Sequence, residues 1–187
     1  MKFLRNVDSL SRSLALSQAR IFENSVSFGI PSKIFIRSYM LSDEVMLIDS
    51  LNLNVAGLTE REIFDVVSKK ITNKRGMLYS FSIMHFIGYF YRMAAYLSGY
   101  SSKQLYEYIK PDLLNRNYQT LHSLPIEEAI KEVFEITHFK TEDKYEYFKK
   151  IYKVDQTIKL MQEINQGVAD VNSGRVMSLE DAKKKLL

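Results

Sequence analysis

Five side chains that could do chemistry recur at helical spacing in the middle of the chain. They are Ser82, His85, Tyr89, Arg92 and Tyr96, separated by three, four, three and four residues. In an α-helix this spacing places all of them on one stripe. Imidazole and phenol groups transfer protons, and tyrosine and arginine anchor many protein interfaces. The stripe therefore predicts either an internal hydrogen-bonded seam or a face that binds a partner.

The sequence lacks the other patterns that catalysis or metal binding needs. It has no cysteine, and its three histidines, His85, His122 and His138, form no HExxH pair. There is no Gly-rich phosphate loop and no GxSxG nucleophile elbow. An enzyme or small-ligand binder would need a pocket that touches His85, Arg92 and His122. We therefore expect a non-enzymatic protein with no catalytic residues, no metal and no cofactor.

The composition is that of a folded protein. Of the 187 residues, 46% are hydrophobic and 12% aromatic, which excludes general disorder. The net charge of +4 permits a nucleic acid or acidic partner without requiring one. The N-terminus has no apolar leader, so we expect a cytoplasmic protein. Segment 78–97 is long enough to cross a bilayer, but His85 and Arg92 lie within it, so we expect a buried helix and no membrane partner.

Capping residues and hydrophobic periodicity predict an all-α fold. Thr59 and Glu62 predict a capping box at one helix start, Gly99 predicts the end of the aromatic helix, and Pro111 predicts the start of the helix that follows. Segment 32–41 is rich in β-branched and aromatic residues, so a strand is the alternative there. Burial of Leu10, Leu14, Ser17, Ile21 and Val26 is expected for the first helix. The expected helices cover 7–28, 43–51, 60–71, 78–98, 103–110, 112–121 and 126–139.

The helix expected at 78–98 has the character of a central core helix. Eight of the 23 aromatic residues fall between Tyr79 and Tyr100, and the helix is apolar on most sides. If Arg92 is buried there, it must meet a carboxylate or several carbonyls, because an unpaired buried charge is costly. We therefore expect a compact helical domain over 1–140 around this helix.

The remaining residues, 141–187, predict an extended helical C-terminal arm. Residues 141–166 form a charged amphipathic pattern, residues 167–175 are small and polar, and Ser178 begins a last short helix. The boundary near Lys140 rests on the rise in charge.

The segment from Phe81 to Glu135 resembles a family of small helical bacterial proteins encoded beside toxins of the ADP-ribosyltransferase type. The shared pattern is an aromatic helix that ends in Tyr, a Ser-Lys-x-x-Tyr helix start, a Tyr-x-x-Leu-His segment and an acidic apolar helix. The matching residues are Tyr96, Ser101, Ser102, Lys103, Tyr106, Tyr118, Leu121, His122, Ser123, Ala129 and Ile130. The resemblance covers less than a third of the chain and implies a toxin as the partner.

The segment from Ile164 to Leu186 resembles the toxin-binding tails of many antitoxins. The shared pattern is D-x-x-x-G-R-V-x-S-x-E-[DE], carried here by Asp170, Gly174, Arg175, Val176, Ser178, Glu180 and Asp181. Such tails fold along the groove of the toxin. Antitoxins with this tail usually carry a DNA-binding module before it, and residues 1–76 show no ribbon-helix-helix pattern.

The sequence thus predicts an antitoxin-like protein that binds and neutralises a cognate toxin. The resemblance of residues 81–135 implies a toxin of the ADP-ribosyltransferase type. Arg175 would pair with toxin carboxylates, and Val176 and Met177 would be apolar anchors. The predicted partner-binding residues are Tyr89, Arg92, Tyr96, Tyr118 and His122 in the domain and Asp170, Arg175, Val176, Met177 and Leu179 in the arm.

The alternative is a nucleic-acid-binding regulator. Segment 57–70 resembles the opening of a helix-turn-helix, and Lys69, Lys70, Lys74 and Arg75 could contact phosphates. The next segment is the aromatic helix and not a polar recognition helix. Cations at the end of a solvated helix are the simpler interpretation.

Overall fold

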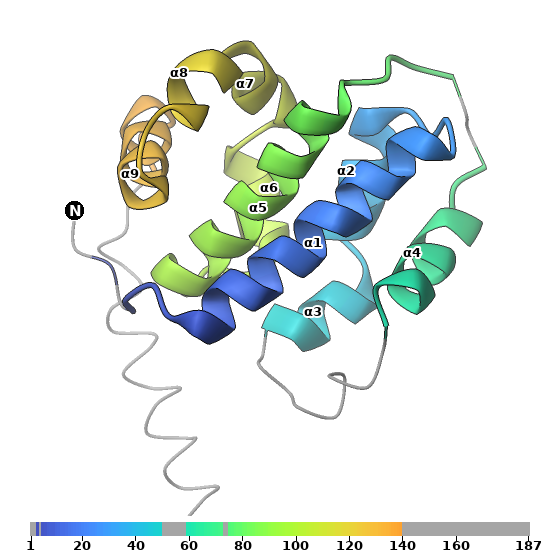
Figure 1. The fold of residues 1–187 in the computed structure, drawn as a ribbon, viewed down its shortest axis with the longest axis horizontal. Coiled ribbons are helices and arrows are strands. Elements are labelled where there is room, and N and C mark those ends of the chain that lie inside the picture. The colour runs from blue at the N-terminus through green and yellow to red at the C-terminus, as the bar shows by residue number, and fades with distance from the viewer. Residues whose placement is uncertain (1–2, 4, 50–58, 73–74, 140–187) are drawn as a thin grey trace, which may run out of the picture. The chain divides into compact units, whose positions relative to one another are not determined.

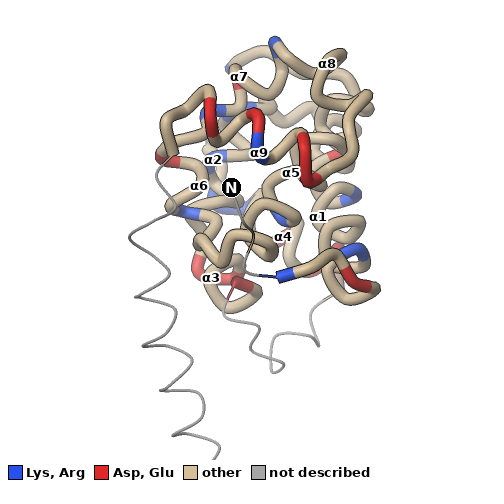
Figure 2. Tube along the Cα trace, turned by 90° about the vertical axis from the view of Figure 1, so that its left-hand side faces the viewer, with Lys and Arg blue, Asp and Glu red and all other residues tan. Residues whose placement is uncertain are grey.

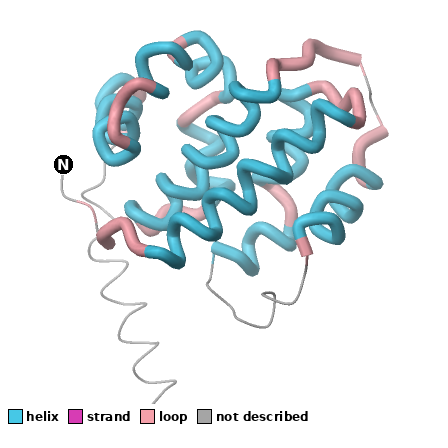
Figure 3. Tube along the Cα trace, viewed as in Figure 1, coloured by secondary structure: helices cyan, strands magenta, loops and turns pink. Residues whose placement is uncertain are grey.

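A computed structural model describes residues 3, 5–49, 59–72 and 75–139. The chain divides into two units, Met1–Thr141 and Glu142–Leu187, and all described residues belong to the first. The described residues form nine helices and no strand (Figures 1 and 3), which confirms the predicted all-α fold. The predicted arm over 141–187 lies outside the described residues.

The helix bounds follow the sequence signals closely. The helices are α1 (Ser9–Ser27), α2 (Ser32–Met40), α3 (Asp43–Asp49), α4 (Glu60–Lys69), α5 (Phe81–Ser98), α6 (Ser102–Tyr108), α7 (Pro111–Arg116), α8 (Tyr118–His122) and α9 (Ile126–Ile136). Segment 32–41 is therefore helical. The single helix predicted over 112–121 is instead two helices, with the break at Asn117.

Side-chain caps explain where several helices begin. Asp8 accepts a hydrogen bond from the Ser11 amide at 2.7 Å, which starts α1. Thr59 and Glu62 form the predicted capping box at the start of α4. At the C-terminal end of α5, Gly99 has a φ of 70°, a left-handed conformation that glycine adopts without a steric cost.

The centre of the fold is the antiparallel pair of α1 and α5, which run side by side in Figure 1. A Cβ added at Gly88 would lie 2.8 Å from Ala19 Cα and 2.9 Å from Gln18 O. The two backbones therefore approach each other so closely that only glycine fits at this point of α5.

This close approach corrects the predicted buried face of α1. Leu10 is 50% exposed, although it was expected in the core. At the closest approach to α5 the residue of α1 is the small Ala19, because a larger side chain would hold the two helices apart. The buried residues of α1 are Ser11, Ala15, Gln18, Ala19, Ile21, Phe22 and Ser25.

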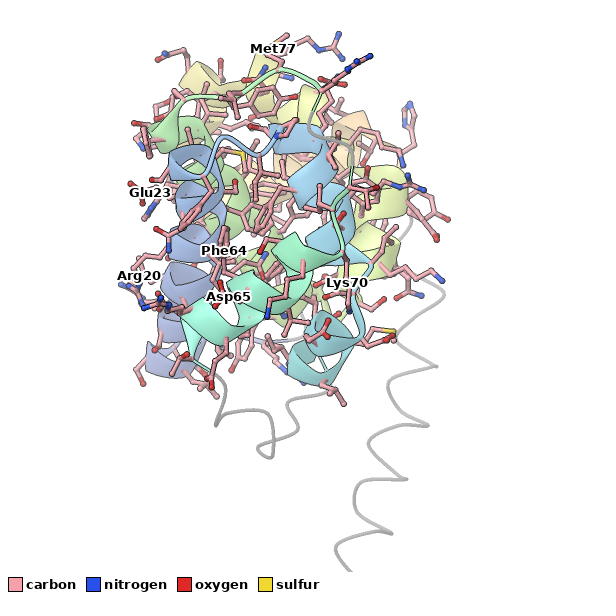
Figure 4. All side chains as sticks on the ribbon, turned by 90° about the vertical axis from the view of Figure 1, so that its right-hand side faces the viewer. Arg20, Glu23, Phe64, Asp65, Lys70 and Met77 are labelled. Atoms are coloured by element: carbon pink, nitrogen blue, oxygen red, sulfur yellow. The ribbon has the colours of Figure 1, made fainter. Side chains whose placement is uncertain are left out.

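The other helices cover the sides of this pair. Arg20 on α1 pairs with Glu60 on α4, and Lys70 Nζ lies 3.1 Å from Glu44 Oε1 at the start of α3. Figure 4 shows α4 beside α1 with Arg20 and Lys70 at opposite ends of it. Phe64 joins α4 to the core through a ring contact with Phe35 at 5.6 Å.

Candidate partner-binding groove

An open groove with a volume of about 630 Å³ lies between α1 and α8, with α5 beneath it. Its apolar surface includes Leu16 from α1, Leu124 from the α8–α9 connection and Ile126 at the start of α9. The full lining consists of Leu16, Ser82, His85, Phe86, Tyr89, Tyr118, Leu121, His122, Leu124 and Ile126. The volume lies within the range of small-molecule and cofactor pockets, and the lining combines apolar and hydrogen-bonding groups.

Helix spacing explains why these side chains meet. Ser82, His85, Phe86 and Tyr89 lie on neighbouring positions of one face of α5. The break at Asn117 turns the chain into α8, whose Tyr118, Leu121 and His122 face the same side. The connection through Pro125 then returns the chain past the groove into α9.

An aromatic cluster gives one wall of the groove its shape. The Phe86 ring lies 5.5 Å from the Tyr118 ring and 6.0 Å from the His122 ring, both nearly edge to face. The Tyr118 and His122 rings are 5.1 Å apart. Phe86 and Leu121 are buried beneath them, whereas His122 is exposed. Edge-to-face pairs of this kind stabilise the wall beyond the apolar area that they bury.

One imidazole of the groove is held by a carboxylate. His85 Nδ1 lies 3.1 Å from Glu23 Oε2 of α1, and about 40% of each side chain is exposed. His85 also lines the groove, so its second ring nitrogen could form a hydrogen bond with an occupant.

Arg92 is part of an internal seam and does not line the groove. It is 3% exposed, and its Nη1 donates to Asp49 Oδ1 of α3 at 2.7 Å. Its Nε donates to Gln18 Oε1 of α1 at 2.8 Å. Asp49 also accepts hydrogen bonds from the Ser102 amide and hydroxyl, at 2.6 and 2.8 Å. Arg92 thus has the carboxylate that a buried guanidinium needs. It belongs to an internal hydrogen-bonded seam, which was one of the two interpretations of the stripe.

The same seam perturbs a buried tyrosine. Burial raises the pKa of Tyr39 to about 12, and the charge and hydrogen bond of the Arg92 guanidinium oppose that rise. Gln18 Nε2 is buried without a hydrogen-bond partner among the described residues. Polar contacts inside the core therefore join five helices, through Gln18, Tyr39, Asp49, Arg92 and Ser102.

Tyr96 lies at the other end of the stripe and is tied to the start of α1. Its hydroxyl donates to Asp8 Oδ2 at 2.5 Å, and the Arg5 guanidinium lies 5.0 Å from its ring centre. The hydrogen bond from Tyr96 lowers the pKa of Asp8 and, in turn, raises the pKa of Tyr96. Tyr96 is half-buried and lies outside the groove.

The structure therefore brings together three of the five domain residues predicted to contact a partner. Tyr89, Tyr118 and His122 line one groove, whereas Arg92 and Tyr96 make internal contacts. The groove touches His85 and His122 but not Arg92, so the three-residue pocket expected of an enzyme is not formed. The predicted arm residues, Asp170, Arg175, Val176, Met177 and Leu179, lie outside the described residues.

The sequence analysis missed the aliphatic half of the groove. Ile126 was predicted only as a core residue and Leu121 only as part of the resemblance, whereas Leu16 and Leu124 were not predicted at all. Leu16 lies outside the buried face that was predicted for α1. One signal was available: residues 81–91 and 117–126 contain no Lys, Arg, Asp or Glu, in a chain of which 26% is charged.

Of the basic residues of the nucleic-acid alternative, the three that the structure describes do not line the groove. Lys69 is exposed at the end of α4, and Lys70 is engaged by Glu44. Arg75 is exposed and Lys74 lies outside the described residues.

Neither a membrane span nor a metal centre is found in the part of the chain that the structure describes. No helix there is long and apolar enough to cross a membrane. Within the same ranges, no three His, Cys, Asp or Glu side chains gather in a way that could hold a metal ion. Comparisons with protein-family models, with curated proteins and with solved structures found no match to this chain.

Proposed function

We propose that this chain is a non-enzymatic, antitoxin-like bacterial protein that binds and neutralises a cognate toxin in the cytoplasm. The observation that carries the proposal is the convergence of Tyr89, Tyr118 and His122 on one open groove. These residues come from two segments of the sequence, and both segments belong to the resemblance with proteins encoded beside ADP-ribosyltransferase-type toxins.

The proposal assigns the toxin two contacts. The groove would receive one surface of the toxin, and the arm would occlude its active cleft. In the arm, Arg175 would pair with toxin carboxylates while Val176 and Met177 fill apolar positions. A tail that orders on binding loses part of its contact energy to that ordering, so the preformed groove would supply a fixed first attachment.

The experiment is affinity capture of the tagged full chain from its native host in high salt, followed by mass spectrometry. High salt removes partners that are held only by surface charge. We expect one small protein in near-stoichiometric amount that stops growth when it is expressed alone. A lane without such a protein would remove the main support for the proposal.

A truncation separates the two contacts. A chain that ends at Gln166 retains every described residue and should keep the same melting temperature. We expect it to bind the toxin much more weakly than the full chain. If it binds and neutralises equally well, the assignment of a contact to the tail is wrong.

A further inference from the structure

We infer that the groove accepts the uncharged, apolar stripe of an α-helix from the partner, with basic residues flanking that stripe. This inference rests on the proposed function, because it names the chemistry of the toxin segment that the same groove would hold. It follows from the charge of the lining, the kind of secondary structure that can dock there, and the charge of the rim.

The lining itself excludes charged side chains from the inserted face. None of its ten residues is Lys, Arg, Asp or Glu. Below the rim lie Phe86 and Leu121, which are 6% and 1% exposed and provide apolar surface only. A charged group inserted above them would lose its water without gaining an opposite charge, and that loss is costly.

The walls favour a helix as the inserted element. The groove runs between helices, and the described residues contain no strand whose edge could pair with an extended peptide. Recognition by strand addition is therefore not available on this part of the chain. Proline-rich segments dock in aromatic grooves, whereas an amphipathic helix places residues i, i+3 or i+4, and i+7 into an apolar groove. The aliphatic half of this groove, formed by Leu16, Leu121, Leu124 and Ile126, favours the helix.

Leu16 gives the groove an apolar side chain that an occupant could cover. It is 41% exposed and lines the groove together with Phe86, Tyr118 and Leu121. Ser82, Tyr89 and His122 add hydroxyl and imidazole groups to the apolar lining, and interfaces also combine apolar and polar groups.

The carboxylates of residues next to the groove favour basic residues on either side of the stripe of that helix. Glu23 stands beside His85 on the α1 side, and α9 begins at the groove with Ile126 followed by Glu127 and Glu128. Over its length α9 carries four Glu and one Lys, and Figure 2 views the molecule from this side. Basic residues next to the stripe would meet these carboxylates in solvent and contribute mainly to the association rate.

The test is selection of 16-residue peptides from a random display library against the full chain, with depletion on the L16K variant. We expect a consensus with apolar residues at helical spacing, Lys or Arg beside them, and no Asp or Glu on the stripe. An alternating, strand-like consensus or an acidic consensus would overturn the inference. So would a set of peptides that all bind the L16K variant as tightly as the parent.

The consensus peptide is then synthesised and its affinity measured against two matched variants. L16K should weaken binding at least tenfold, because it places an ammonium group in the apolar groove. L10K adds the same charge to an exposed leucine of the same helix, outside the groove, and should change binding less than twofold. Equal losses in the two variants would contradict docking in the groove.

Because the peptides come from a random library, this result does not depend on the toxin. A helical, basic-flanked consensus without capture of a toxin would leave the groove chemistry standing and overturn the proposed function. Capture of a toxin whose binding is insensitive to L16K would leave the proposed function standing and overturn the inference about the groove.

Discussion

The Cα of Ala19 lies so close to Gly88 that a Cβ added to this glycine would overlap it, at a distance of only 2.8 Å. This contact between α1 and α5 sets the spacing of the two central helices. It places Gln18 within reach of Arg92 and Glu23 within reach of His85, at 2.8 and 3.1 Å. The internal seam and one wall of the groove both depend on it.

Replacement of Gly88 by Ala should therefore destabilise the fold. Ala favours a helix over Gly by about 1 kcal/mol, but the added methyl would overlap backbone atoms of α1 that have no room to move. We expect a net loss of about 1–3 kcal/mol in the free energy of unfolding, measured with urea. Ser13→Ala on the exposed side of α1 should change it by less than about 0.5 kcal/mol. A stabilised Gly88→Ala variant would show that the helices are not in such close contact.

The Arg92–Asp49 pair should be strongly non-additive. Arg92→Met alone leaves the Asp49 carboxylate buried without its counter-charge and should cost about 3–5 kcal/mol. The double variant Arg92→Met/Asp49→Leu removes both charges, so it should be less destabilised than the sum of the two single variants. A double-mutant cycle in urea measures the difference. Additive losses would mean that the pair does not interact in solution.

Tyr39 should make the protein less stable at alkaline pH. Between pH 10 and about 12 the unfolded chain releases the phenolic proton while the folded chain retains it, so stability falls as the pH rises. Tyr39→Phe removes this part of the loss, which amounts to roughly 2–3 kcal/mol by pH 12. Unfolding free energies of both proteins at pH 8, 10 and 11 test this. Two curves that stay parallel over this range would contradict a raised pKa at Tyr39.

The capping box at the start of α4 offers a local prediction. The Glu62 amide donates to Thr59 Oγ1 at 3.2 Å, and Glu62 Oε2 accepts from the Thr59 amide at 2.7 Å. Thr59→Ala should lower the free energy of unfolding by about 1 kcal/mol, and Thr59→Ser should restore most of it. An Ala variant as stable as the parent would show that the cap contributes nothing.

Local signals predicted the helices well, because capping and chain stops depend on neighbouring residues. The Thr59–Glu62 box, the Gly99 stop and the Pro111 start are all at their predicted positions. Several helix ends differ from the predicted ones by up to three residues, as at Phe81 and Ile136. Two larger errors have a different origin. The break at Asn117 and the exposure of Leu10 depend on which helices pack together, and a single sequence does not specify that.

The candidate site shows the same difference between what local sequence predicts and what helix packing decides. The stripe from Ser82 to Tyr96 was predicted as a unit, but its members have separate roles. Ser82, His85 and Tyr89 line the groove, Arg92 closes a buried ion pair, and Tyr96 holds the start of α1. Helical spacing identifies a shared face, whereas the partner helix that covers each turn decides whether a residue is internal or available.

The most direct test of the central claim is a growth-rescue assay with the captured partner. Cells that express the partner alone should stop growing, and co-expression of the full chain should restore growth. L16K should rescue poorly and L10K should rescue fully, with both variants as stable as the parent. Full rescue by L16K, or a partner that is harmless when expressed alone, would contradict the claim that the groove neutralises a toxin.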